Sequence, residues 1–71
     1  MIITLKKETP QEEIDRLADY FEKQGVKVNF IRGENYNVFG LVGDTTRIYE
    51  RDIQANEWVE NVQRVQMNLV I

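Results

Sequence analysis

The acidic side chains in the N-terminal third are the first candidates for a catalytic site, because they occur in closely spaced pairs. Glu12 and Glu13 are adjacent, and Asp15 and Asp19 stand four residues apart. Two nearby carboxylates act as general acid and general base when their surroundings push their pKa values apart. Here a helix-capping motif and a solvated helix face explain both pairs from their positions alone. The acidic residues therefore predict no acid–base site.

Three further features could bind a ligand, and each has a structural explanation. "GLVGD" (40–44) carries two glycines but lacks the lysine and the serine or threonine of a phosphate-binding loop. Thr45 and Thr46 have no base nearby in the sequence and are better read as caps. Trp58 could stack on a base, but its acidic neighbours disfavour nucleic acid. We expect no catalytic residue in this chain.

Composition narrows the class of protein. The chain has 71 residues, a net charge of −3, and neither cysteine nor histidine. Disulfides, thiolate metal sites and imidazole chemistry are therefore excluded. The acidic balance argues against nucleic acid, and lysines at positions 6 and 7 leave no room for a signal peptide or membrane span at the N-terminus. We expect a cytoplasmic protein with no cofactor, no nucleic-acid partner and no membrane partner.

The clearest local pattern predicts a helix. Thr9 is placed to be the N-cap, Pro10 the first helical residue and Glu12 the reciprocal partner of a capping box. Gly25 is placed to end the helix, because glycine adopts the left-handed conformation without steric cost. Between them an apolar stripe recurs at helical spacing: Ile14, Leu17, Ala18 and Phe21.

The remaining elements complete a recognisable order. Strands are predicted at Ile2 to Leu5, Val26 to Arg32, Tyr36 to Gly43 and from about Asn61. In the last strand the alternation of apolar and polar residues slips between Val62 and Val65. A second helix is predicted at roughly Ile48 to Ala55, with Tyr49 and Ile53 facing inward. This order favours an α+β fold, a ferredoxin-like βαββαβ sandwich with a four-stranded antiparallel sheet and both helices on one face. The first and third strands would be central. One domain is expected to span residues 1–71.

The third strand is apolar on both sides, which raises the question of what covers its second side. A three-residue turn, 33–35, would pair Phe30 with Val38 and turn Val38 and Val42 toward the helices. Gly40 would then face the helix or mark a bulge. The face left open is expected to carry Ile2, Thr4, Asn29, Ile31, Phe39 and Leu41.

A sheet face that met only water would show polar residues at alternate positions. We therefore interpret this face as a docking surface for another copy, for the rest of a longer chain, or for an apolar ligand between copies. The alternative is the scattered apolar surface of any soluble protein.

The stretches "MIITLKK", "TPQEEID", "GVKVNFIRGE" and "NVFGLVGDTTRI" together resemble the N-terminal domain of type I beta DAHP synthase (3-deoxy-7-phosphoheptulonate synthase). That family shows a short apolar first strand, a Thr or Ser opening an acidic helix, and a Gly before the second strand. An R-G or K-G turn and a third strand ending in G-x-x-G-D follow. The resemblance covers essentially the whole chain.

The resemblance implies a ferredoxin-like, ACT-like regulatory domain that precedes a (β/α)8 catalytic barrel. Such domains pair as homo-oligomers through their sheet faces, and tyrosine or phenylalanine binds there as a feedback inhibitor of aromatic amino acid biosynthesis. Asn29 and Ile31 stand where regulated members hold the effector. With Phe39 and Leu41 from the open face, they form the predicted effector-binding and interface site. The alternative function is a docking or dimerisation module without a small-molecule ligand.

Overall fold

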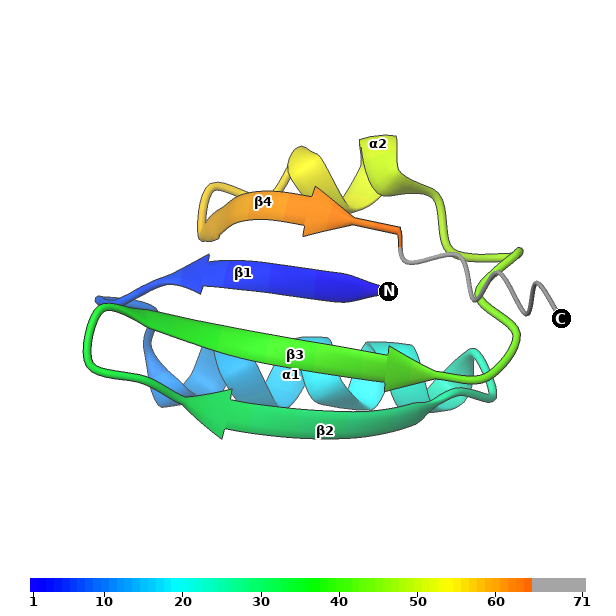
Figure 1. The fold of residues 1–71 in the computed structure, drawn as a ribbon, viewed down its shortest axis with the longest axis horizontal. Helices are drawn as coiled ribbons and strands as arrows, with labels where there is room; N and C mark the ends of the chain where they lie inside the picture. The colour runs from blue at the N-terminus through cyan, green and yellow to red at the C-terminus, as the bar shows by residue number, and fades with distance from the viewer. Residues whose placement is uncertain (65–71) are drawn as a thin grey trace, which may run out of the picture.

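The computed structural model describes residues 1–64, and their elements follow the predicted order (Figure 1). The elements are β1 (Ile2–Lys6), α1 (Gln11–Lys23), β2 (Lys27–Arg32), β3 (Tyr36–Val42), α2 (Glu50–Gln54) and β4 (Val59–Gln63). The sheet order is β2-β3-β1-β4, and every neighbouring pair is antiparallel. The predicted ferredoxin-like fold, with the first and third strands in the centre, is confirmed.

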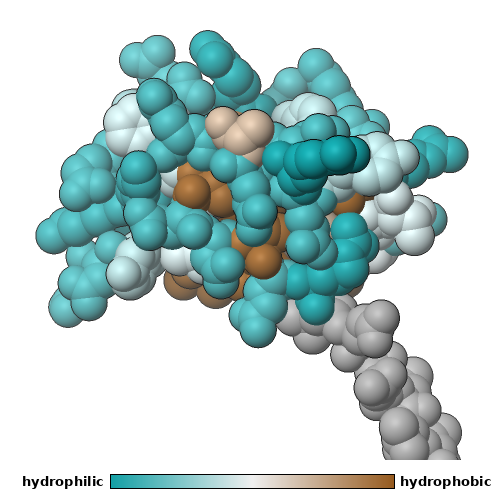
Figure 2. All heavy atoms as spheres, turned by 90° about the horizontal axis from the view of Figure 1, so that it is seen from above, coloured by the Kyte–Doolittle hydropathy of each residue, from teal (hydrophilic) through white to brown (hydrophobic). Residues whose placement is uncertain are grey.

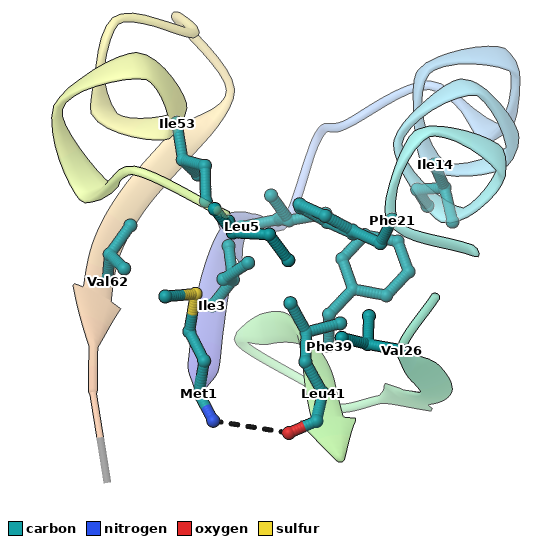
Figure 3. Packing of buried hydrophobic residues seen from close by; sticks show 11 residues of the cluster. Met1, Ile3, Leu5, Ile14, Phe21, Val26, Phe39, Leu41, Ile53 and Val62 are labelled. Atoms are coloured by element: carbon teal, nitrogen blue, oxygen red, sulfur yellow. Dashed lines mark hydrogen bonds between the residues drawn. The ribbon is translucent and has the colours of Figure 1, made fainter. Parts of the chain in front are cut away.

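Both helices lie on the same side of the sheet, and the core fills the space between them and the strands (Figure 3). The buried apolar residues are Met1, Ile3, Leu5, Ile14, Phe21, Val26, Phe39, Leu41, Ile48, Ile53 and Val62. Phe39 lies centrally: its ring centroid is 5.7 Å from that of Phe21 on α1 and 5.2 Å from that of Phe30 on β2. Met1, which precedes β1, donates from its N-terminal ammonium to the Leu41 carbonyl at 3.2 Å.

The start of α1 differs from the predicted capping box. Pro10 occupies the N-cap position, and no side chain caps the helix. The Thr9 hydroxyl instead donates to the Lys6 carbonyl at 2.6 Å, and the Thr9 amide donates to the same oxygen at 3.2 Å. The buried Asn37 amide also reaches it, at 3.4 Å. Thr9 is therefore used to close the turn after β1, because the unpaired carbonyl at the strand end competes for its hydroxyl.

The rest of α1 follows the sequence pattern. Ile14 and Phe21 are buried, and Leu17 and Ala18 pack against the core. Gly25, just after the helix, has φ +87°. This is the left-handed conformation expected at a glycine that ends a helix.

The predicted register between β2 and β3 is wrong by one residue. Phe30 pairs with Phe39, and Val28 pairs with Leu41. Because side chains alternate along a strand, this slip turns every residue of β3 to the opposite face. Phe39 and Leu41, expected on the open face, are 0% and 5% exposed beneath the helices.

The turn chemistry explains the slip. Gly33 closes the hairpin: its amide donates to the Tyr36 carbonyl at 2.9 Å, which leaves only Glu34 and Asn35 at the tip of the turn. A Cβ on Gly33 would lie 2.7 Å from the same carbonyl oxygen, so this position requires glycine. The "R-G" pair thus belongs to the end of the hairpin ladder.

The structure also differs from two predictions for the second half of the chain, which concern the second helix and the start of the last strand. Helix α2 is shorter than expected, and Tyr49 is 62% exposed, whereas Ile48 replaces it in the core at 0% exposure. Tyr49 stands at the N-cap with extended backbone (φ −96°, ψ 125°), so helical spacing does not apply to it. Strand β4 begins two residues earlier than predicted, and its pairing with β1 is irregular at Thr4 and Leu5. The predicted slip toward Val65 lies in part outside the described residues.

The register can be tested by comparing substitutions on the two opposite faces of β3. We expect Phe39→Ala to lower the free energy of unfolding by about 3–5 kcal/mol, because it empties the middle of the core. Val42→Ala, on the other face, should cost less than about 1 kcal/mol. Urea denaturation measures both, and Phe39→Leu provides a milder core change of at most about 1.5 kcal/mol should the alanine variant not fold. Equal costs at positions 39 and 42 would contradict the observed register.

Candidate functional site

The sheet face opposite the helices, here called the open face, is formed by the outward side chains of all strands. It consists of Ile2, Thr4 and Lys6 of β1, Lys27, Asn29 and Ile31 of β2, Tyr36, Val38, Gly40 and Val42 of β3, and Glu60, Asn61 and Gln63 of β4, where Glu60 is the extra residue of the irregular pairing. Cross-strand pairing arranges them in rows. One row runs Asn29, Gly40, Ile2, Gln63, and the next runs Ile31, Val38, Thr4, Asn61.

The open face holds four of the six large apolar side chains that are exposed within residues 1–64. Ile2 is 38%, Ile31 61%, Tyr36 51% and Val42 58% exposed, and the only other large apolar side chains exposed in the described part are Tyr20 and Tyr49. Viewed from the α2 side, by contrast, the molecule is mainly hydrophilic, with a limited apolar area between polar side chains (Figure 2). Apolar exposure is thus concentrated on one face.

The structure separates the predicted site residues into two pairs. Asn29 and Ile31 lie on the open face, on neighbouring rows of β2. Phe39 and Leu41 belong to the core and turn their side chains away from that face. Val38 and Val42 take their places. The open face is therefore still apolar, but its central side chains are smaller than expected.

A cleft of about 450 Å³ opens at one end of the open face, where β3 runs past the start of β1. Its lining residues are Met1, Ile2, Gly40, Leu41, Val42, Gly43 and Thr45. Its size falls within the usual range for small-molecule sites, and such sites are mostly apolar. Sequence reasoning missed this cleft because it placed Gly40 beneath the helices. Pairing the larger side chains of β2 and β3 inward would have placed Gly40 correctly.

The segment that follows β3 forms one wall of the cleft and is fixed by Arg64. The guanidinium donates to the Ile48 carbonyl at 2.8 Å and to the Thr45 hydroxyl at 3.1 Å. It also forms an ion pair with Glu50 at 3.1 Å. The planar, multiply donating guanidinium suits this arrangement, because it serves several acceptors from one position. Arg64 thereby ties the cleft wall to the end of β4.

Asp44 stabilises the same wall locally. Its carboxylate accepts the Thr46 hydroxyl at 2.7 Å and the Thr46 amide at 3.0 Å. These two hydrogen bonds hold the pKa of Asp44 below its ordinary value, and the positive charge of Arg47 acts in the same direction. Thr46 is thus engaged by Asp44 in a turn, and the helix predicted to follow directly begins only at Glu50.

A second cleft, of about 420 Å³, lies at the other end of the sheet and is polar. Its lining residues are Lys6, Lys7, Glu8, Asn35, Tyr36 and Glu60. The two lysines are opposed by two glutamates, so the cleft has no net charge with which to attract an ion.

The described residues offer no metal centre and no membrane-spanning element. Within 1–64, no three acidic, histidine or cysteine side chains are grouped so that they could bind a metal ion. No helix in that part of the chain is long and apolar enough to cross a membrane.

Comparison with known proteins gives two findings. The family model described as "DAHP synthase ferredoxin-like domain" matches residues 1–67. The crystal structure of phospho-2-dehydro-3-deoxyheptonate aldolase (DAHP synthase) from Thermotoga maritima is similar, with a TM-score of 0.81 and 26% sequence identity. The match covers 92% of this chain and 19% of that chain, so this chain spans about a fifth of its length. No curated protein matches the sequence.

The role of Arg64 in fixing the cleft wall can be tested by substitution. We expect Arg64→Ala to lower the free energy of unfolding by about 1–3 kcal/mol, because it leaves the partly buried Ile48 carbonyl without its donor. Arg64→Lys should recover only part of this, since an ammonium cannot reach all the acceptors at once. Chemical denaturation measures the loss, and Arg51→Ala, at an exposed position of α2, is the matched control. If the two alanine variants are equally stable, Arg64 has no such role.

Proposed function

Because the chain belongs to the family of DAHP synthase ferredoxin-like domains, we propose that residues 1–71 form a regulatory domain of a 3-deoxy-7-phosphoheptulonate synthase. The domain has no catalytic role of its own. It pairs with a second copy through the open face and binds an aromatic amino acid, tyrosine or phenylalanine, as feedback effector. The transferase reaction would belong to a separate (β/α)8 barrel in a cytoplasmic enzyme.

The observation that carries this proposal is the apolar open face. A soluble domain gains stability when such side chains leave water, by about 1.5–3 kcal/mol for each fully buried large apolar residue. Ile31, Tyr36 and Val42 are each more than half exposed. A domain of this length is stable by only about 4–10 kcal/mol. Covering this face would therefore add a large fraction of the stability that the domain has alone.

The polar residues of the open face suit a small zwitterionic ligand. Asn29 can both donate and accept hydrogen bonds, so its amide can serve a carboxylate or an ammonium group. Ile31, on the same strand, supplies apolar contact. These are the two residues of the predicted site that face outward.

A docking module without any ligand is the second candidate. It is favoured by the composition of the row Ile31, Val38, Thr4 and Asn61, which contains no charged side chain. Apolar contact alone could hold two sheets together, as in any sheet-on-sheet packing. The two candidates share the pairing and differ in the effector.

Self-association through the open face can be measured by sedimentation velocity. We expect the protein to form dimers at tens to hundreds of micromolar, and we expect Ile31→Asp or Val42→Asp to shift it to monomer, because each buries a charge at the interface. Tyr49→Asp is the matched control, since Tyr49 is 62% exposed but lies outside the open face. A monomer at all concentrations would remove the pairing, and loss of the dimer in the Tyr49 variant would place it elsewhere.

Effector binding can be measured by calorimetric titration. We expect heat on addition of millimolar L-tyrosine or L-phenylalanine, with weaker binding in Asn29→Ala because one polar contact is lost. L-Leucine serves as a ligand control for the aromatic ring. Absence of heat with both aromatic amino acids would remove the effector and leave the docking module.

A further inference from the structure

Strand β3 runs past the start of β1 and has no neighbouring strand on that side within residues 1–64. The ladder between the two strands ends where the Leu41 amide donates to the Met1 carbonyl at 2.8 Å and the Met1 ammonium donates to the Leu41 carbonyl at 3.2 Å. Val42, the next residue of β3, pairs only with Lys27 of β2. The cleft of about 450 Å³ lies at this point, and none of its lining side chains is charged. An apolar segment can therefore enter it without burying an ion.

Strand β4 leads the chain to the same cleft. The end of β4, the end of β3 and the N-terminus lie at the same end of the molecule (Figure 1). Gln63, the last residue of β4, pairs with Ile2, which lines the cleft. Neighbouring strands lie about 4.8 Å apart, so the far wall of the cleft on β3 is about 10 Å from β4. Three extended residues span about 10 Å, so the residues that follow Arg64 can cross the cleft.

The alternation at the end of β4 indicates which side chains would face the cleft. Val62 faces the core at 7% exposure, and Gln63 lies on the open face. Arg64 donates to the Ile48 carbonyl on the helix side. Continued alternation turns the following odd-numbered residues to the open face. In the sequence 65–71, "VQMNLVI", no residue is charged, and the odd-numbered residues are all apolar: Val65, Met67, Leu69 and Ile71.

The other surfaces described suit this segment less well. Four of the six residues that line the cleft at the opposite end of the sheet are charged: Lys6, Lys7, Glu8 and Glu60. An apolar segment would have to dehydrate those charges. A short tether also gives a segment of the same chain an effective concentration of about millimolar, above the concentration of a second copy in solution. The segment of the same chain is therefore the favoured occupant of the uncharged cleft.

We propose that residues 65–71 cover the uncharged cleft as an intrachain strap, with the Met67 side chain placed between Ile2 and Val42. This inference goes beyond the proposed function, because it assigns a contact within one chain and requires neither a second copy nor a ligand. The strap shields one end of the open face from water. It leaves Ile31 and Tyr36, which lie away from the cleft, to a second copy.

A disulfide between the strap and the far wall of the cleft tests this placement. The chain has no cysteine, so an introduced pair can bond only with each other. In the full chain at submicromolar concentration, we expect Val42→Cys with Met67→Cys to form an intramolecular disulfide about ten-fold faster than Val42→Cys with Gln66→Cys, because a bridge needs Cα atoms about 4.4–6.8 Å apart and Cβ atoms that point toward each other. Tyr49→Cys with Met67→Cys, which places one cysteine outside the open face, is the second control. Mass spectrometry under non-reducing conditions measures each rate.

Thermal unfolding gives an independent measurement. We expect Met67→Asp to lower the melting temperature of the full chain by about 5 °C or more, because the strap would bury a charge or leave the cleft. Gln66→Asp, the same charge one residue away, should lower it by less than about 2 °C.

Each outcome decides the inference without deciding the proposed function, which is tested by Ile31→Asp at the other end of the face. Equal rates for the pairs with Met67→Cys and Gln66→Cys, or equal melting temperatures for the two aspartate variants, would overturn the strap. Disulfides that form only between chains would show that the cleft receives the segment of a second copy, which also overturns an intrachain strap. A selective Val42–Met67 bridge together with the selective loss in Met67→Asp would establish it.

Discussion

The packing of Phe39 decides which side chains of β3 lie in the core and which lie on the open face. Its ring lies against Phe21 of α1 and Phe30 of β2, in tilted and edge-to-face arrangements at centroid distances of 5.2–5.7 Å. Because side chains alternate along a strand, the inward position of Phe39 places Leu41 inward and turns Val38, Gly40 and Val42 to the open face. The composition of the open face is thus a consequence of how the core packs.

The hairpin turn and the core favour the same register. Gly33 closes a turn with two residues at its tip, where any other residue would crowd the Tyr36 carbonyl, and the resulting pairing brings Phe30 opposite Phe39. Agreement between turn chemistry and burial of the largest side chains is the kind of consistency that specifies one structure. At the other end of the sheet, Arg64 joins β4 to the segment after β3.

The open face that results carries Val38, Gly40 and Val42 along its central strand β3. Had Phe39 and Leu41 been exposed, the face would have carried two large protruding side chains suited to an apolar partner. Valines and a glycine instead take these positions, opposite Lys27, Asn29 and Ile31 of β2, and a cleft opens where β3 runs past the start of β1.

The sequence by itself determined the element order, the central position of β1 and β3, the apolar stripe of α1 and its end at Gly25, because periodicity and glycine punctuation are local signals. It also placed Asn29 and Ile31 on the open face. The sequence could not decide the orientation of β3, since valines alternate there with Phe39 and Leu41 and both faces read as apolar. Only the tertiary structure decided the orientation of β3, through the Gly33–Tyr36 turn and the contacts between aromatic rings. It also decided that Thr9 binds the Lys6 carbonyl and that Ile48 faces the core. Both registers fit the local apolar pattern equally well, but a slip of one residue exchanges every side chain of the strand between core and surface.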